Sequence, residues 1–260
     1  NLSGAIEFSL KSFELAPGQV MAYWFLSLLH FDLKEYDKAI SALKKVEQVL
    51  RVPTAQRSNH IASDLDVKMV DLHKRFALTY ESAGDYDKAM EYQFHLMEQS
   101  KDSDEAVQGF LRCVERSTDS HAAVAALTSL LKRRPERRKL FFPLAWHYRR
   151  LNDYAAALKY IDRTIEMEPT NVSAFAFAAR WRAEVGDPIE AENLVAIAEQ
   201  KNLRSFDLHK LGLELSLKRG DVNSAFRHLD LMVQTTDADL SPIKNRLAAL
   251  AAKMSASPVS

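Results

Sequence analysis

A 34-residue period in the placement of alanine constrains this 260-residue chain more than any other feature of its sequence. The hexapeptide EYDKAI at 35–40 returns as DYDKAM at 85–90. The alanine of this motif has equivalents along the chain: Ala5, Ala39, Ala89, Ala123, Ala157, Ala191 and Ala225. Five of the six intervals are 34 residues, and the sixth, of 50 residues, is one period plus an insertion of 16. Such a period is typical of a fold in which one small unit is stacked many times.

Other positions keep the same period and indicate that each unit is a pair of helices. Proline follows three of these alanines by twelve residues, where a helix should end: Pro17, Pro135 and Pro169. Gly-Asp pairs recur at 84–85, 186–187 and 220–221, where the glycine can end one helix and the aspartate can cap the next. Apolar residues recur at three- and four-residue spacing, as in AISALKKVEQVL at 39–50. The sequence therefore predicts an all-α fold.

A 34-residue helix–turn–helix unit resembles the tetratricopeptide repeat, whose pattern places aromatic, small and proline residues at fixed positions. Unit 138–171 carries this pattern most fully, with Phe141, Leu144, Ala145, Tyr148, Tyr154, Ala157 and Pro169. The resemblance implies a right-handed α-solenoid of about six such repeats, with an N-terminal half repeat and a C-terminal capping helix. In such an array each unit buries its apolar face against its neighbours.

We expect a single solenoid over residues 1–260, with repeat boundaries set by the period. The expected repeats are 20–53, 70–103, 104–137, 138–171, 172–205 and 206–239. A half repeat at 2–19 precedes them, and a capping helix at about 241–254 follows. The insertion at about 52–67 is expected to lengthen the next helix, with a loop as the alternative. Because the chain starts with the second helix of a unit, we expect it to be part of a longer array.

In the family that the chain resembles, partners bind a concave groove lined by the first helix of each repeat. The equivalent positions here are rich in basic and aromatic residues: Lys74, Arg75, Arg112, Arg116, Lys139, Phe142, Trp146, Arg149, Arg150, Phe177 and Arg180. Guanidinium groups pair with carboxylates, and aromatic rings hold apolar side chains. The resemblance therefore implies a protein or peptide partner, such as an acidic segment. The alternative is that these arginines pair with the chain's own Glu81, Glu105, Glu115 and Glu184.

The segment YWFLSLLHF at 23–31 is too apolar for a helix with one face in water. Its candidate docking face consists of Met21, Trp24, Phe25, Leu28 and Phe31. We expect neighbouring repeats to cover this face. A partner helix or a second copy of the chain, giving a homodimer, is the alternative.

The sequence carries no signature of catalysis, of nucleic-acid binding or of membrane insertion. It lacks a phosphate-binding glycine loop, a G-x-S-x-G motif and an H-E-x-x-H motif. Lys+Arg and Asp+Glu both number 35, which argues against a nucleic-acid partner. A helix that spans a bilayer needs about 18 consecutive apolar residues, and no apolar stretch of this sequence approaches that length. A cytoplasmic and a periplasmic location fit the sequence equally well.

The residue types that bind metals or act as nucleophiles are few and scattered. Cys113 is the single cysteine and is expected to be buried. His73 and His209 occupy a position that usually holds a packing aromatic, so we expect both to pack. We therefore expect no catalytic residue, no metal and no cofactor.

These observations predict a non-catalytic protein–protein interaction scaffold. By resemblance, such arrays in bacteria often organise envelope, secretion or polysaccharide-export assemblies. The alternative is a regulatory or substrate-recruiting array that belongs to a larger enzyme, such as a glycosyltransferase.

Overall fold

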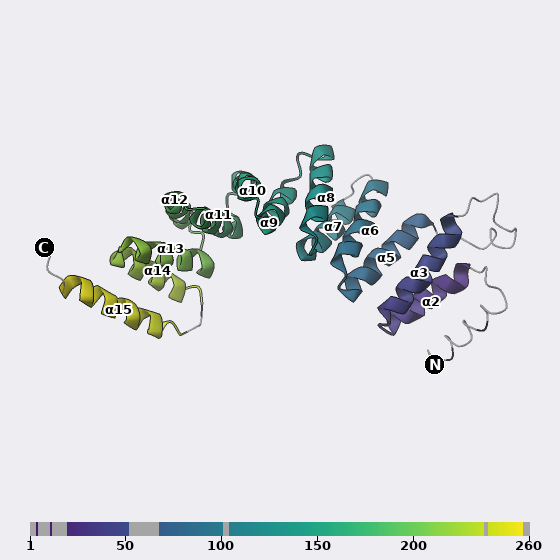
Figure 1. Ribbon diagram of the computed structural model, residues 1–260, viewed down its shortest axis with the longest axis horizontal. Helices are drawn as coiled ribbons and strands as arrows, with labels where there is room; N and C mark the ends of the chain where they lie inside the picture. The colour runs from purple at the N-terminus through teal and green to yellow at the C-terminus, as the bar shows by residue number, and fades with distance from the viewer. Residues whose placement is uncertain are drawn as a thin grey trace. The chain divides into compact units, whose positions relative to one another are not determined.

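The computed structural model describes residues 4, 11, 20–51, 68–100, 104–236 and 239–256 (Figure 1). These residues form 13 α-helices and one 3-10 helix, and no strand occurs among them. The predicted all-α fold is confirmed. Within the described ranges no helix is long and apolar enough to cross a membrane. The insertion at 52–67 and nearly all of the half repeat at 2–19 lie outside the described residues.

The chain divides into two compact units, and the first comprises Asn1–Ala126. Its described helices are α2 (Val20–Asp32), α3 (Tyr36–Arg51), α5 (Met69–Ala83), α6 (Tyr86–Gln99) and α7 (Asp104–Arg116). Each of these helices packs against the next one along the chain. The boundary between the units falls within α8 (Ser120–Arg133).

The second unit comprises Leu127–Ser260. After the 3-10 helix η2 (Arg138–Leu140) it contains α9 (Phe141–Arg150), α10 (Tyr154–Met167), α11 (Val172–Glu184), α12 (Pro188–Gln200), α13 (Phe206–Arg219), α14 (Val222–Val233) and α15 (Ser241–Ala256). Consecutive helices again pack together, and α11 also contacts α13, two helices further on. This nearest-neighbour packing is how repeat proteins bury their apolar faces.

The Gly-Asp pairs form the predicted turns between helices. Gly84, Gly186 and Gly220 have φ values of 82°, 87° and 78°, in the left-handed region that glycine adopts without strain. The aspartate that follows each glycine accepts a hydrogen bond from the backbone N–H three residues later, at 3.0–3.2 Å. Asn152, with a φ of 60°, takes the place of glycine before the capping residue Asp153. The turn and capping roles read from the sequence are confirmed.

The turn at 117–119 has no glycine and is held by a side chain of the preceding repeat. The Asp87 carboxylate accepts hydrogen bonds from the Ser117 hydroxyl at 2.6 Å and from the Thr118 hydroxyl at 2.5 Å. It also accepts from the backbone N–H groups of Thr118 and Asp119, at 2.8 and 3.1 Å. Burial raises the pKa of Asp87, but these hydrogen bonds outweigh it and lower the pKa to about 2. Asp87 therefore fixes the turn between α7 and α8.

The alanines of the period that the structure describes are all fully buried: Ala39, Ala89, Ala123, Ala157, Ala191 and Ala225. Ala157 on α10 is 0% exposed and belongs to the core of the second unit, together with Phe175 and Trp181 of α11. A larger side chain here would force the two helices apart. We expect Ala157→Leu to lower the free energy of unfolding by about 1–3 kcal/mol.

Ala155 supplies the matched control for this change, because it lies on the same helix and is exposed. Ala155→Leu should change the free energy of unfolding by less than about 0.5 kcal/mol. Urea denaturation followed by circular dichroism measures both variants. Equal losses would show that the buried alanine is not a steric requirement of the packing.

Candidate binding groove

The first unit contains a cleft of about 450 Å³ between α5, α6 and α7. Helix α5 contributes four residues at helical spacing along one face: Val70, Lys74, Leu78 and Glu81. Helix α6 contributes Gln93, Leu96 and Gln99, with Ser100 just after its end, and α7 contributes Glu105, Ala106 and Arg112. Apolar groups and polar groups of both charges therefore meet in one cavity.

The charges in this cleft are partly neutralised by the chain itself. Arg112 Nε lies 3.4 Å from Glu81 Oε1. The Arg112 side chain is 60% exposed, so this pair adds little stability, although it occupies the guanidinium. The Lys74 ammonium, by contrast, has no ion-pair partner among the described residues. Lys74 is therefore the cation of the cleft that is available to an incoming carboxylate.

Two further predicted groove residues of the first unit are bound to aromatic rings. The guanidinium of Arg75 lies 4.3 Å from the centroid of the Phe31 ring, and desolvation by burial lowers the pKa of Arg75. Arg116 donates a hydrogen bond to the Tyr86 hydroxyl at 2.9 Å, and its guanidinium lies 5.2 Å from the Tyr86 ring. Neither residue lines the cleft, and both link neighbouring helices.

The predicted residues of the second unit form an aromatic cluster beside ion pairs. The Phe177 ring lies 5.2 Å from the Trp146 ring and 5.9 Å from the Phe142 ring. Trp146 is 36% exposed, so one side of this cluster faces solvent. Lys139 and Arg150 are exposed as well.

The two other predicted arginines of the second unit, Arg149 and Arg180, are paired with carboxylates. Arg149 donates to Glu184 Oε2 from Nη2 at 2.7 Å and from Nε at 3.2 Å. The Tyr154 hydroxyl also donates a hydrogen bond to Glu184 at 3.1 Å. Burial raises the pKa of Tyr154, and this hydrogen bond raises it further. Arg180 lies 3.7 Å from Asp207. Arg149 and Arg112 therefore pair with glutamates of the chain itself, which is the alternative that the sequence left open.

The apolar face expected on α2 is partly covered. Phe25 is 52% exposed, whereas Met21, Trp24, Leu28 and Phe31 are half-buried. Phe31 packs against Tyr36 at 5.7 Å in addition to Arg75. The residues expected to cover this face from the N-terminal side lie outside the described part of the chain.

Cys113 is fully buried, as the sequence predicts. Burial raises the pKa of its thiol to about 12, so the reactive thiolate form is suppressed at neutral pH.

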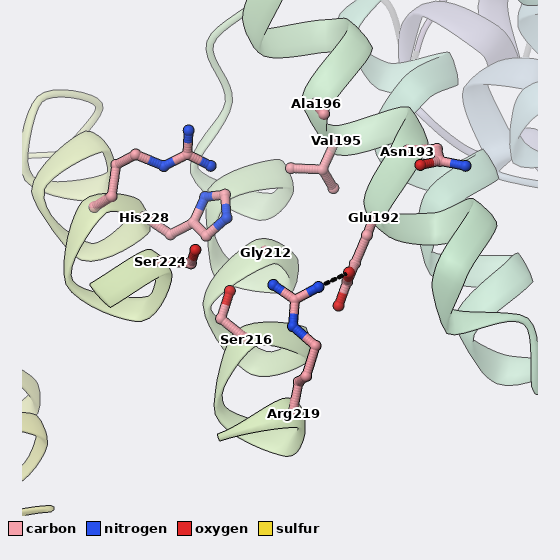
Figure 2. Close-up of a pocket in the computed structure, with 10 residues that line it drawn as sticks. Glu192, Asn193, Val195, Ala196, Gly212, Ser216, Arg219, Ser224 and His228 are labelled. Atoms are coloured by element: carbon pink, nitrogen blue, oxygen red, sulfur yellow. Dashed lines mark hydrogen bonds and ion pairs between the residues drawn. The ribbon is translucent and has the colours of Figure 1, made fainter. Parts of the chain in front are cut away.

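A smaller pocket of about 220 Å³ lies between α12, α13 and α14 of the second unit (Figure 2). It is lined by Glu192, Ser216, Arg219 and His228, among others, and an ion pair joins Arg219 to Glu192. The backbone of Gly212 reaches this pocket, and a Cβ atom there would lie 2.5 Å from the His228 ring. Glycine at this position therefore makes room for the imidazole.

Two segments of the chain match the tetratricopeptide-repeat family, residues 22–49 and residues 115–172. No curated protein sequence matches the chain. Among solved structures, MamA of Desulfovibrio magneticus RS-1 is similar with a TM-score of 0.54 at 14% identity, over 65% of this chain and 97% of that one. PilF of Pseudomonas aeruginosa is similar with a TM-score of 0.51 at 15% identity, over 84% of this chain and 93% of that one.

A chain in the structure of Naa15/Naa10 bound to HypK-THB is also similar, with a TM-score of 0.54 at 12% identity. That similarity covers 96% of this chain and 39% of the other. At such identities the likeness concerns the fold, and it agrees with the repeat matches in the sequence. The chain therefore contains tetratricopeptide repeats, at residues 22–49 and 115–172.

Proposed function

We propose that this protein is a non-catalytic scaffold that binds a segment of a partner protein in the cleft between α5, α6 and α7. The repeat family and the fold support an interaction scaffold. The observation that carries the cleft assignment is the exposure of Leu78 (44%) and Val70 (36%) beside Lys74. Exposed apolar side chains within a concave, polar-rimmed cavity are typical of an interaction site.

The chemistry of the cleft favours a segment with one apolar anchor next to a carboxylate. Leu78 and Val70 supply an apolar surface for the anchor, and Lys74 supplies a cation for the carboxylate. Arg112 is engaged by Glu81, and Glu105 adds a negative charge to the rim. The cleft thus holds less free positive charge than the arginine content implies, so a single acidic group suits it better than a strongly acidic tract.

Leu78→Asp is expected to weaken binding of such a segment at least tenfold, because it places a charge where the apolar anchor packs. A peptide selected from a displayed random library against the full chain provides the probe, and fluorescence anisotropy measures its affinity. Lys74→Glu should weaken the same peptide by repelling its carboxylate.

Matched controls separate a local effect from a general one. Leu217 on α13 is a leucine of similar exposure, 40%, and lies in the other unit. Lys45 on α3 is an exposed lysine away from the cleft. Leu217→Asp and Lys45→Glu should leave the affinity unchanged. A peptide that binds the Leu78 and Lys74 variants as tightly as the unaltered chain would rule out the cleft as its site.

The wider context is proposed from the family resemblance. We propose that the scaffold serves a bacterial envelope, secretion or polysaccharide-export assembly. The alternative is an array that regulates, or recruits substrate to, a larger enzyme such as a glycosyltransferase. The full-length gene distinguishes them, since a catalytic domain encoded with this chain would contradict a pure scaffold.

A homodimer through the α2 face stays a prediction of the sequence. The exposure of Phe25 supports it, and multi-angle light scattering of the chain tests it.

A further inference from the structure

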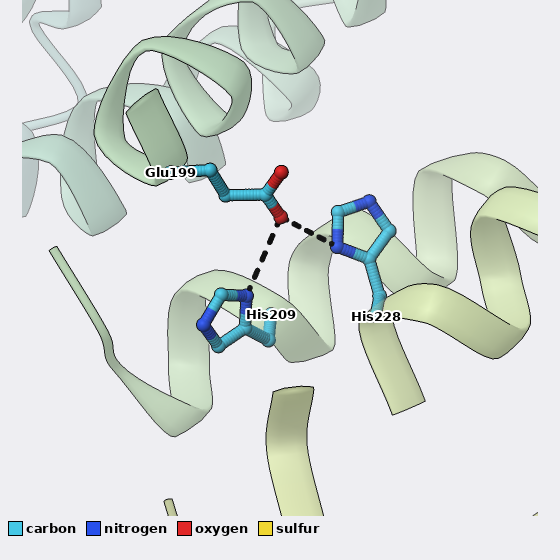
Figure 3. A group of neighbouring side chains, drawn as sticks. All are labelled: Glu199, His209 and His228. Atoms are coloured by element: carbon cyan, nitrogen blue, oxygen red, sulfur yellow. Dashed lines mark ion pairs between the residues drawn. The ribbon is translucent and has the colours of Figure 1, made fainter. Parts of the chain in front are cut away.

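A glutamate and two histidines from three successive helices meet in the interior of the second unit (Figure 3). Glu199 lies near the end of α12, His209 on α13 and His228 on α14. Glu199 Oε1 lies 3.1 Å from His228 Nδ1 and 3.6 Å from His209 Nδ1. We propose that these three side chains form a binding site for one divalent transition-metal ion of the zinc class, which joins the three helices.

The three facing atoms are buried without hydrogen-bond partners. His209 is 1% exposed and His228 is 5% exposed. Glu199 Oε1, the Nδ1 atoms of both histidines and His209 Nε2 make no hydrogen bond to the described residues. Buried polar atoms that lack partners cost folding free energy, so they are rare in native proteins. One cation between them would satisfy the carboxylate oxygen and both Nδ1 atoms at once.

The donor set and its spacing fit such an ion. Imidazole nitrogen and carboxylate oxygen are ordinary zinc ligands, and three protein ligands with an open fourth position are a common arrangement. Zinc bonds of about 2.0–2.1 Å in tetrahedral geometry separate neighbouring ligand atoms by about 3.3 Å. The oxygen–nitrogen distances of 3.1 and 3.6 Å bracket this separation. The three ligand atoms all lie within 4.8 Å of one another, so small side-chain movements suffice.

The surroundings prepare the ligands for a cation. Burial lowers the pKa of both histidines, which keeps the imidazoles neutral, and raises the pKa of Glu199, so the carboxyl group must lose its proton when a cation binds. Arg227 Nη2 contacts Glu199 Oε2 at 3.2 Å. This contact orients the carboxylate so that its other oxygen, Oε1, faces the histidines. Such outer-shell contacts are typical of metal sites.

His228 belongs both to the cluster and to the lining of the smaller pocket (Figure 2). Because Gly212 has no side chain, the His228 ring fits against the backbone of α13. Among the described residues this is the one group of three such side chains with ligand spacing.

Titration of the tag-free full chain with Co²⁺ tests the proposal, since a polyhistidine tag would bind the same metals. We expect one equivalent of Co²⁺ to give the intense visible absorption of a low-coordinate site, and Zn²⁺ to displace it. We also expect Zn²⁺ to raise the melting temperature, because an ion that binds the folded state stabilises it. No absorption change and no rise in melting temperature would overturn the proposal.

Variants locate the site. Loss of a residue that only supports a metal ligand weakens metal binding about 10–100-fold. Glu199→Gln and His209→Gln each remove a ligand, so each should weaken Co²⁺ binding by more than this. Arg227→Gln leaves all three ligands in place, so its loss of Co²⁺ affinity should lie within that range. This variant tests the site if a ligand variant does not fold. His73→Gln is the matched control, because the His73 ring lies 5.6 Å from another histidine ring in the first unit. Unchanged binding in Glu199→Gln and His209→Gln would place the ion elsewhere and refute the site.

Discussion

Replacing Phe76 by alanine is expected to lower the free energy of unfolding by about 3–5 kcal/mol, the largest single loss that we expect in the first unit. Phe76 on α5 is fully buried. Its ring stacks on the Tyr92 ring at 4.5 Å and on the Tyr80 ring at 6.0 Å, so it joins α5 to α6. Alanine would leave a cavity that the surrounding helices cannot fill. Urea denaturation followed by circular dichroism measures the loss.

Phe25→Ala is the control for this change, because Phe25 is 52% exposed on α2. Its removal should alter the free energy of unfolding by less than about 1 kcal/mol. Similar losses in the two variants would contradict the assignment of Phe76 to the core of the repeat.

Asp87→Ala is expected to lower the free energy of unfolding by about 1–2 kcal/mol at neutral pH, less than the whole pKa shift implies, because solvent screens the partly exposed carboxylate. The carboxylate accepts four hydrogen bonds from the turn at 117–119, and alanine would leave those donors without it. Asp37 occupies the same position of the EYDKAI motif in the preceding repeat and is exposed. Asp37→Ala should therefore have little effect. Equal losses from the two aspartates would contradict the role of Asp87.

The contribution of Asp87 should also depend on pH. The pKa of its carboxyl is about 2 in the folded chain, below the ordinary value of 3.8, so folding favours the ionised form. The stabilisation is therefore complete above about pH 4 and disappears as the pH falls towards 2. The difference in unfolding free energy between the unaltered chain and Asp87→Ala should shrink over this window. A constant difference from pH 7 to pH 2 would show that the hydrogen bonds do not depend on the charge.

Local sequence was sufficient to predict the parts of this fold that depend on the period of the repeat. The turns at Gly84, Gly186 and Gly220 and the burial of Cys113 were predicted correctly. The turns follow from a requirement that recurs in most units, a left-handed residue before a helix cap, whereas the burial of Cys113 follows from the residue type. Repetition makes such requirements visible in one sequence.

The role of Asp87 was not predictable, because Asp37 has the same neighbours in sequence. What distinguishes the two aspartates is the partner turn thirty residues later, which lacks glycine at 117–119. The ion pairs of Arg112 and Arg149 likewise depend on residues one repeat away. The sequence showed that such pairs could form, but the choice among the available glutamates depends on helix packing.

The cleft and the Glu199 cluster show the same limit. Val70 lies four residues before Lys74 on α5, and this helical spacing could have indicated that both residues line the cleft. Leu96 lies on the second helix of the repeat, where the sequence predicted no groove residue. The sequence placed His209 among packing residues without indicating that Glu199 and His228 lie beside it. Nor did the sequence indicate that Gly212 makes room for the His228 ring.

Site-specific photo-crosslinking tests the central claim, that a partner segment binds between α5, α6 and α7, most directly. A photoreactive phenylalanine derivative replaces Leu78 in the cleft in one variant, and replaces Leu217 on α13 in the other. The selected peptide, labelled with a fluorophore, is added to each variant at equal occupancy and irradiated. We expect a covalent adduct from position 78 and none from position 217. Crosslinking from position 217 alone would contradict the proposed cleft.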